Sequence, residues 1–191
     1  MKKILFGTSN KHKFEEAKVL FRQYDIIVEQ YVPRTPEIQN DNLENIAKYT
    51  VLHEIQNINK PLFVEDAGIF IEELNGFPGP YSSYVQKTIG NIGILKLMEG
   101  VRNRDAEFRS VVAYCEPNTK PATFMGITKG YIAMEIRGGR MFGYDPIFIP
   151  YEGDGRAYSE MAPAEKNKIS HRGKALILFI NRLKDRMWSY V

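Results

Sequence analysis

The sequence predicts an α/β protein with a mixed sheet in a single domain, on three observations. Apolar segments and amphipathic stripes alternate as strand, helix, strand, helix, strand over residues 3–64. A middle region rich in Val, Ile, Thr, Tyr and Phe then predicts antiparallel strands before a final helix. Hydrophobic residues make up 43% of the 191 residues, enough for a sizeable core, and no linker interrupts the chain. We therefore interpret residues 1–191 as one domain.

The first part of the chain predicts a strand, a helix and a second strand. Residues 3–7 form a short apolar run that ends in the turn-like segment 8–10, as expected of a buried first strand. Apolar residues then recur at roughly helical spacing from Phe14 to Tyr24, and residues 26–29 resemble a strand again. A proline-bounded loop follows and separates this unit from the next helix.

The second predicted helix has the clearest pattern. Residues 43–58 carry one apolar stripe, with Asp41 or Asn42 as the candidate cap. Residues 62–64 then form a short apolar strand that leads directly into the acidic segment 65–68. Open α/β sheets place their chemistry at the carboxyl ends of such strands, so this segment is a candidate site.

The second half predicts a helix, two antiparallel strands, a last short strand and a last helix. The helix covers residues 84–99, and the strands cover 107–115 and 121–136. Residues 142–150 read as a loop that enters a strand. Ser170 is the candidate cap of the last helix, whose apolar stripe consists of Leu176, Phe179, Ile180, Leu183 and Met187.

Composition excludes several classes of protein. Lys and Arg number 26 against 23 Asp and Glu, and the resulting net charge of +3 is too mild to predict binding to a nucleic acid polymer. The single cysteine, Cys115, excludes an intramolecular disulfide and a cysteine-based zinc site. No apolar run reaches about 18 residues, and the apolar start is too short for a signal peptide. We therefore expect a soluble cytoplasmic protein without a membrane partner.

The first candidate site lies between the first strand and the first helix. Hydroxyl side chains and backbone N–H groups at a helix N-terminus favour anions, and nearby lysines add positive charge. The segment contains no P-loop pattern, and its alternative interpretation is a capped, solvated helix start. Its residues are Thr8, Ser9, Asn10, Lys11, His12 and Lys13.

The second candidate site is a set of acids that suits a divalent cation. Glu37 lies in the proline-rich loop, and Glu65 and Asp66 follow the third strand. Oxygen-only ligands are typical of Mg²⁺, with Mn²⁺ as the alternative. Adjacent residues of an extended chain point to opposite sides, so we expect only one of Glu65 and Asp66 to face the same site as Glu37. The alternative is a set of solvated loop acids.

The third candidate site is a C-terminal set that could hold a base. A phenylalanine beside a glycine can offer a ring face for stacking, and His and Arg can donate to a carbonyl oxygen. The alternatives are that Phe142 belongs to the core and that His171 and Arg172 form an exposed helical turn. The set comprises Phe142, Gly143, Tyr144, Asp145, Lys166, Ser170, His171, Arg172 and Lys174.

Taken together, these segments resemble the inosine triphosphate pyrophosphatase family. The resemblance rests on TSNKHK, on EDAG with the following NGFPGPYSS, on FGYDPIF and on SHRGKAL, and it covers almost the whole chain. These Ham1-like enzymes hydrolyse ITP, dITP and XTP to a nucleoside monophosphate and pyrophosphate, which cleanses the nucleotide pool. The family fold implies an elongated molecule with a long mixed sheet and two lobes around a central cleft. The resemblance also implies a homodimer.

The resemblance assigns roles to residues at matching positions. Asp66 is the implied proton acceptor and binds Mg²⁺ together with Glu37, and residues 8–13 hold the triphosphate. Lys48 lies near another phosphate-binding position of the family. Ala67 stands where many members have serine, so only its backbone N–H remains as a donor. The residues implied to enclose the purine and ribose are Phe142, Gly143, Tyr144, Asp145, Lys166, His171 and Arg172.

The candidate site also predicts which purine bases are selected, and two alternative functions stay open. Hypoxanthine and xanthine carry an O6 acceptor where adenine carries an amine donor, so donors from Lys166, His171 and Arg172 favour O6 purines over adenine. The alternatives are a pyrophosphatase for another modified nucleotide and a non-catalytic nucleotide-binding protein. The acids Glu37 and Asp66 argue against the latter, because carboxylates repel phosphates unless a metal lies between them.

Overall fold

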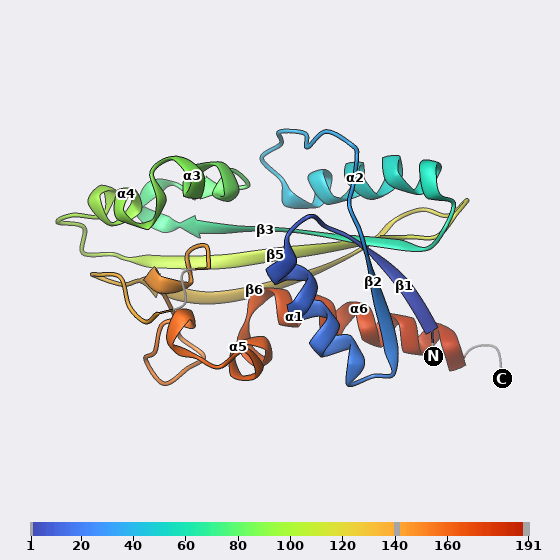
Figure 1. Cartoon of the computed structure of the whole chain (residues 1–191). Coiled ribbons are helices and arrows are strands. Elements are labelled where there is room, and N and C mark those ends of the chain that lie inside the picture. Colours follow the sequence, from blue (N-terminus) through green and yellow to red (C-terminus); the bar gives the residue numbers. More distant parts are fainter. Residues whose placement is uncertain (1, 140–141, 189–191) are drawn as a thin grey trace.

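A long mixed sheet runs through the whole molecule (Figure 1). The structure is a computed structural model that describes residues 2–139 and 142–188. The seven strands are ordered β2-β1-β3-β5-β6-β7, with β4 paired to β3 off this path. Their bounds are β1 (Lys2–Gly7), β2 (Ile26–Tyr31), β3 (Leu62–Ile71), β4 (Pro78–Gly79), β5 (Asp105–Cys115), β6 (Ala122–Ile132) and β7 (Phe148–Pro150).

The helices cover both faces of this sheet. They are α1 (Lys11–Arg22), α2 (Leu43–Ile58), α3 (Ser82–Thr88), α4 (Gly90–Leu97), α5 (Pro163–Ile169) and α6 (His171–Trp188), with 3₁₀ turns at Glu72–Leu74, Asp145–Ile147 and Tyr158–Glu160. Helices α1 and α6 pack on one face around Phe63 and Phe179. Helix α2 packs on the other face around Val51 and Val64. The expected mixed α/β sheet is therefore confirmed.

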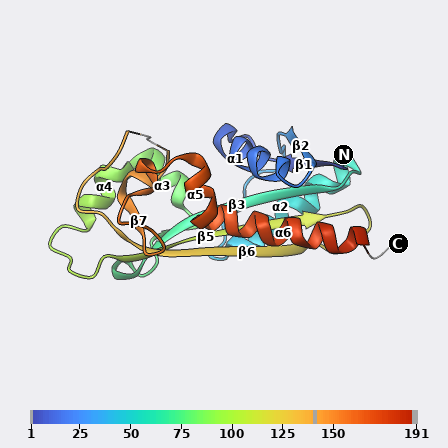
Figure 2. The same ribbon diagram turned by 90° about the horizontal axis from the view of Figure 1, so that it is seen from below.

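The molecule is elongated, and the two ends of the sheet carry different helices (Figures 1 and 2). One end holds β1, β2, α1 and α2, and the other holds β7, α3 and α4. A separate apolar cluster fills the second end and includes Ile69, Ile94, Phe108 and Phe148. The continuous strands β3, β5 and β6 join the two lobes. No helix in the described part of the chain is long and apolar enough to cross a membrane.

The third strand is much longer than its apolar pattern predicts. We expected a strand over residues 62–64 and a loop at 65–68, but β3 extends to Ile71. Strand β1 pairs with β3 only as far as Val64, whereas β5 pairs with it along its whole length, from Leu62 to Ile71. The antiparallel partner therefore keeps the acidic segment extended after the parallel partner has ended.

The helices and strands of the second half also differ from the expectation. The helix expected over residues 84–99 is divided into α3 and α4, because Gly90 at the junction has a φ of +59°, outside the helical region. Strand β6 ends at Ile132 rather than at residue 136, and helix α5 was not expected.

The expected helix starts and the last apolar stripe are confirmed. The Asn42 side chain accepts a hydrogen bond from the Glu44 N–H and caps α2. The Ser170 Oγ accepts one from the Gly173 N–H at the start of α6. The side chain of Met187 lies outside the described residues. The other stripe residues are all buried, namely Leu176, Phe179, Ile180 and Leu183.

Candidate active site

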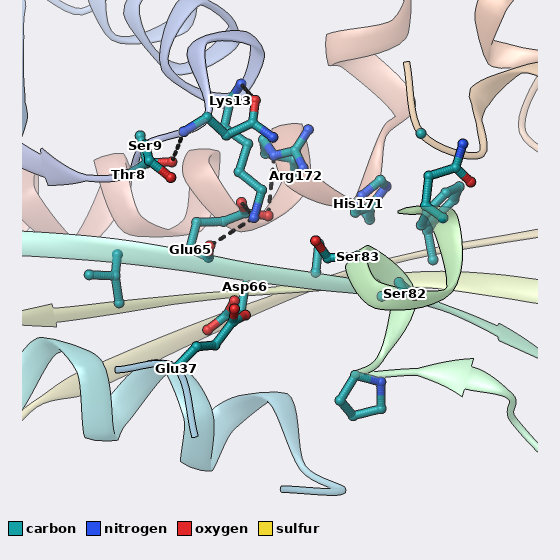
Figure 3. Close-up of a pocket in the computed structure, with 18 of the residues that line it drawn as sticks. Thr8, Ser9, Lys13, Glu37, Glu65, Asp66, Ser82, Ser83, His171 and Arg172 are labelled. Atoms are coloured by element: carbon teal, nitrogen blue, oxygen red, sulfur yellow. Dashed lines mark hydrogen bonds and ion pairs between the residues drawn. The ribbon is translucent and has the colours of Figure 1, made fainter. Parts of the chain in front are cut away.

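A cavity of about 610 Å³ opens where β1 ends and β3 continues toward the second lobe (Figure 3). Its walls come from segments that are distant in sequence, so the fold brings all three candidate sites together. Helix α3 adds Ser83 and Lys87, to which the sequence assigned no role, although Ser83 ends the NGFPGPYSS segment of the family resemblance. The expected residues that line the cavity are Thr8, Ser9, Asn10, Lys13, Glu37, Asp66, Ala67, Phe142, Gly143, Tyr144, Asp145, Lys166, His171 and Arg172.

The loop before α1 is held by hydrogen bonds to its own backbone. The Asn10 Oδ1 accepts from the N–H groups of His12 and Lys13 and caps the helix. The Thr8 Oγ1 accepts from the Asn10 N–H, at 3.1 Å. These contacts leave the positive end of the α1 dipole at the cavity, as an anion site requires. The side chains of Lys11 and His12 are exposed and do not line this cavity.

The two adjacent acids of β3 point in different directions, as the strand geometry predicts (Figure 3). Glu65 is fully buried, with its Oε2 at 2.9 Å from Lys13 Nζ. Its Oε1 accepts from the Ser110 hydroxyl at 2.6 Å. Although burial opposes ionisation, the charges of Arg172 and Lys13 hold the pKa of Glu65 far below its ordinary value. Asp66 instead points toward Glu37.

Among the described residues, none forms a hydrogen bond or ion pair with the Asp66 carboxylate. Burial raises the pKa of Asp66 to about 6, and the negative charges of Glu65 and Glu37 act in the same direction against the attraction of Lys13. An unpaired carboxylate beside a second acid suits a divalent cation.

The donor set fits Mg²⁺ better than a cation that needs a complete protein cage. Over the described ranges, no group of three His, Cys, Asp or Glu residues is arranged to hold a metal ion. Glu37 and Asp66 both line the cavity, and Mg²⁺ commonly uses one or two carboxylates together with water and substrate phosphates. The two residues expected to bind the cation therefore lie at the same cavity.

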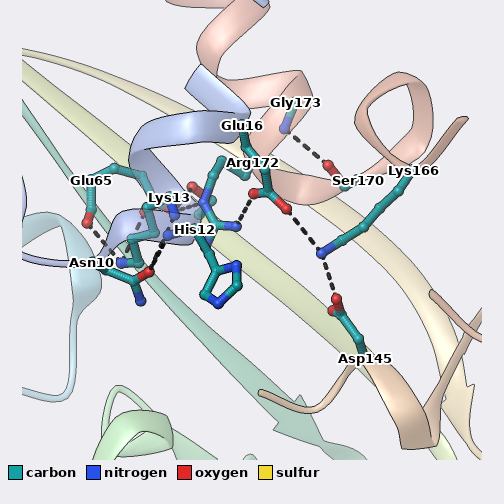
Figure 4. Close-up of polar contacts among 11 residues, drawn as sticks. Asn10, His12, Lys13, Glu16, Glu65, Asp145, Lys166, Ser170, Arg172 and Gly173 are labelled. Atoms are coloured by element: carbon teal, nitrogen blue, oxygen red, sulfur yellow. Dashed lines mark hydrogen bonds and ion pairs between the residues drawn. The ribbon is translucent and has the colours of Figure 1, made fainter. Parts of the chain in front are cut away.

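Six side chains of alternating charge form a continuous row along the cavity wall (Figure 4). Lys13 pairs with Glu65, and Glu65 Oε1 lies 3.2 Å from Arg172 Nε. Arg172 then contacts Glu16 at 2.5 Å, and Glu16 contacts Lys166 at 3.1 Å. The row ends with Lys166 Nζ at 2.6 Å from Asp145 Oδ2. Every charge in this row has an opposite neighbour, so the row carries no net charge, and all of its members except Glu16 line the cavity.

Glu16 is the member of this row that the sequence analysis missed. Its side chain is only 17% exposed and accepts hydrogen bonds from Lys166 and Arg172, which are 150 and 156 residues away in sequence. The i, i+3 spacing from Lys13 places both residues on one face of α1 and could have indicated it. Only the tertiary structure identifies its partners.

His171 and Arg172 are buried, so an exposed first helical turn is excluded for both. The His171 ring stacks on Phe108 at 4.3 Å between centroids, and its buried Nδ1 has no hydrogen-bond partner among the described atoms. Burial, together with the charge of Arg172, lowers the pKa of His171 well below its usual value, so the imidazole is neutral. Arg172 uses Nε and one terminal nitrogen for its acidic partners, which leaves further N–H groups for a ligand.

Phe142 is half-buried at the edge of the cavity and does not belong to the core. Its ring lies 4.8 Å from the His12 ring and 5.2 Å from Lys166 Nζ. The following loop is fastened to the second lobe, because the Tyr144 hydroxyl donates to the Ser82 carbonyl at 2.8 Å. One aromatic face is thus presented beside the buried charge row.

Lys48 lies apart from this arrangement. Its Nζ is 2.6 Å from Glu44, one turn earlier on α2, and the residue does not line the cavity. Lys174 likewise pairs with Glu152 at 2.5 Å, outside the cavity lining.

Comparisons with known proteins agree with this geometry. The Ham1 family profile matches residues 4–182. The chain is 53% identical over 185 residues to a protein of Methanopyrus kandleri named dITP/XTP pyrophosphatase, covering 97% of this chain and 98% of that protein. It is 48% identical over 185 residues to the Thermococcus kodakarensis protein of the same name, covering 97% and 99%.

Solved structures show the same fold. The HAM1 protein of Coxiella burnetii superposes with a TM-score of 0.85 at 30% identity, covering 97% of this chain and all of that one. The Ham1 protein of Staphylococcus aureus gives a TM-score of 0.83 at 26% identity, with the same coverage. Profile, sequence relatives and fold all lead to one family, and the chain belongs to the Ham1 family.

Proposed function

We propose that this protein hydrolyses the non-canonical purine nucleotides dITP, XTP and ITP to the nucleoside monophosphate and pyrophosphate, with Mg²⁺ as the cofactor. The observation that carries the proposal is one cavity lined by the N-terminal end of α1, by Glu37 and Asp66, and by Phe142 and the buried His171 and Arg172. The names of the relatives that are about half identical to this chain agree with this activity.

The phosphate end of the substrate is assigned to the α1 side of the cavity. The backbone N–H groups after Thr8 and the Lys13 ammonium would bind the triphosphate oxygens. Glu37 and Asp66 would hold Mg²⁺ (or Mn²⁺), which supplies charge neutralisation and a more acidic water when bound. Binding of phosphate competes with Glu65 for Lys13, since Lys13 Nζ lies 2.9 Å from that carboxylate.

Asp66 would act as the proton acceptor. A water oxygen forms a bond to the α-phosphorus, and the bond from this phosphorus to the α,β-bridging oxygen breaks. The proton of the water passes to the Asp66 carboxylate, and pyrophosphate leaves with the bridging oxygen. With a pKa of about 6, this carboxylate is ionised near neutral pH and basic enough to accept a proton.

The base end would lie between Phe142 and the buried charge row. Remaining N–H groups of Arg172 and the neutral His171 ring can donate to O6 of hypoxanthine or xanthine. An adenine amine would meet donors there, and buried donors without acceptors are costly. The proposal therefore includes selection against ATP.

The direct test is pyrophosphate release from dITP, XTP, ITP and ATP, each with Mg²⁺ and with a chelator. We expect release from the first three with Mg²⁺, little from ATP, and none with the chelator. Equal rates for ATP and ITP would contradict the base assignment. Binding of ITP without any release would instead favour the non-catalytic alternative.

We also infer a homodimer that acts in the cytoplasm. Helices α3 and α4 and the junction between them expose four large apolar side chains that a second copy could cover, namely Tyr84, Ile89, Ile92 and Leu97. The single cysteine is buried and free, which suits a reducing compartment.

A further inference from the structure

Helix α2 contains a fully buried carboxylate that the proposed chemistry does not use. The Glu54 Oε2 accepts a hydrogen bond from the Tyr31 hydroxyl at 2.6 Å. The Glu54 Oε1 accepts from two backbone N–H groups, those of Arg34 at 2.7 Å and Thr35 at 2.6 Å. Burial opposes ionisation, yet hydrogen bonds from Thr35 and Tyr31 hold the pKa of Glu54 below its ordinary value. One oxygen of this buried carboxylate is therefore directed at the loop that follows β2, and the other at Tyr31, the last residue of β2.

That loop carries Glu37. Residues 32–42 contain no helix or strand, and Pro33, Thr35 and Glu37 all line the cavity. Among the described hydrogen bonds, those that fasten residues 33–37 go to Glu54. An exposed loop of this kind would otherwise sample many conformations.

Helix α2 is in turn fixed to the strand that carries Asp66. Val51 and Ile55, which flank Glu54, share an apolar cluster with Leu62 and Val64 of β3. Asp66 follows Val64 by two residues on the same strand. Glu54 thus connects the loop that carries Glu37 to the helix that packs against the strand of Asp66.

We propose that Glu54 is a positioning residue, which holds the loop of residues 33–37 so that Glu37 and Asp66 can share one divalent cation. This inference rests on the proposed function, because it assumes that these two acids bind the cation. Partners that orient metal ligands from outside typically affect metal affinity by about 10–100-fold.

The test measures Mn²⁺ binding by electron paramagnetic resonance and the hydrogen exchange of the Arg34 and Thr35 amides. We expect Glu54→Ala to weaken Mn²⁺ binding about 10-fold or more and to remove protection of both amides. Glu54→Gln should remain close to the wild type, because its carbonyl can face the two amides while its NH₂ donates to the Tyr31 hydroxyl. If Glu54→Ala does not fold, Glu54→Leu takes its place, because leucine fills the buried space of the Glu54 side chain but cannot accept hydrogen bonds.

Two controls separate positioning from general destabilisation. Ile46→Ala removes buried apolar volume from the same helix, outside the cluster that joins α2 to β3, and should leave Mn²⁺ affinity and both amides unchanged at a temperature where it is folded. In a Glu37→Gln background, Glu54→Ala should have no further effect on Mn²⁺ binding, because the ligand it positions is already lost.

The outcomes distinguish this inference from the proposed function. Unchanged Mn²⁺ binding in folded Glu54→Ala, or an undiminished effect in the Glu37→Gln background, would overturn the positioning role. A wild type that binds Mn²⁺ but releases no pyrophosphate from dITP would instead contradict the proposed function and leave the Glu54 result intact.

Discussion

At the scale of single residues, the ionised Asp66 carboxylate, which is proposed to act in catalysis, lowers the stability of the folded protein. Its folded pKa of about 6 lies above the ordinary value of 3.8, so the folded state holds the proton more tightly than the unfolded state. This contribution to stability is complete below about pH 4 and is lost as pH rises through 6. A shift of this size corresponds to at most about 3 kcal/mol.

Asp66→Asn is therefore predicted to abolish most turnover and yet to stabilise the metal-free protein at pH 8. The neutral amide neither accepts the proton nor requires burial of a charge. We expect an increase in the free energy of unfolding of up to about 3 kcal/mol at pH 8 and almost none at pH 4. Urea denaturation with a chelator at both pH values measures this, and equal stabilities at pH 8 would contradict it.

The structure adds a structural role to the base-binding role that is proposed for Arg172. Its guanidinium lies between Glu16 and Glu65 with a side chain only 5% exposed, so Arg172→Ala leaves two buried carboxylates short of a partner. We predict a loss of about 3–5 kcal/mol in stability and a larger fall in kcat/KM for ITP than for ATP. The measurements are chemical denaturation and steady-state kinetics at a temperature where the variant is folded.

Lys174→Ala is the matched control on the same helix. Its partner Glu152 is more than half exposed, so the pair contributes about 0–1 kcal/mol, and the ITP to ATP ratio should not change. An unchanged ratio in Arg172→Ala as well would remove Arg172 from base recognition.

At the scale of elements, the contact between β6 and the first turn of α6 positions His171 and Arg172, the residues proposed to bind the base. A Cβ on Gly126 would lie 2.1 Å from the His171 carbonyl oxygen and 2.5 Å from the Ala175 nitrogen. Both are backbone atoms, so Gly126→Ala must displace the turn that carries His171 and Arg172. We predict a loss of about 1–3 kcal/mol in stability together with a fall in kcat/KM for ITP.

Gly139→Ala serves as the control for this prediction. Apart from its chain neighbours, no heavy atom of the described residues lies within 4 Å of its Cβ position, so the stability and activity of the variant should match those of the wild type. Thermal denaturation and ITP turnover of the two variants are compared directly. A Gly126→Ala protein as active as Gly139→Ala would show that the first turn of α6 does not determine the site.

At the scale of the whole molecule, exposed apolar side chains on α3 and α4 support the inferred homodimer. Ile92 is 62% exposed and lies on α4. We predict that the protein sediments at twice the 22.0 kDa of one chain and that Ile92→Asp shifts it toward the monomer, because a buried unpaired charge opposes association. Leu178→Asp changes an exposed apolar residue on α6 and should leave the dimer intact.

Much of the fold is determined locally and could therefore be predicted from the sequence. Helical stripes, the Asn42 and Ser170 caps and the β-rich middle follow from the preferences of neighbouring residues. The roles of the candidate site residues stay a prediction from their types, their spacing and the family resemblance, although the fold brings most of them to one cavity. Boundaries that depend on a partner were missed: the pairing of β3 with β5 extends the strand from Val64 to Ile71.

The tertiary structure alone decides how these residues act together. Glu16 meets Lys166 and Arg172 across 150 and 156 residues, and no local pattern can encode a contact between distant elements. Glu65 and Asp66 are adjacent acids, yet ion pairs lower the pKa of Glu65 while burial raises that of Asp66. The sequence determined which chemical groups are present. The packing of β3 between α1 and α2 decided which acid is neutralised by ion pairs and which has none among the described residues, because charge energies depend on surroundings assembled only by folding.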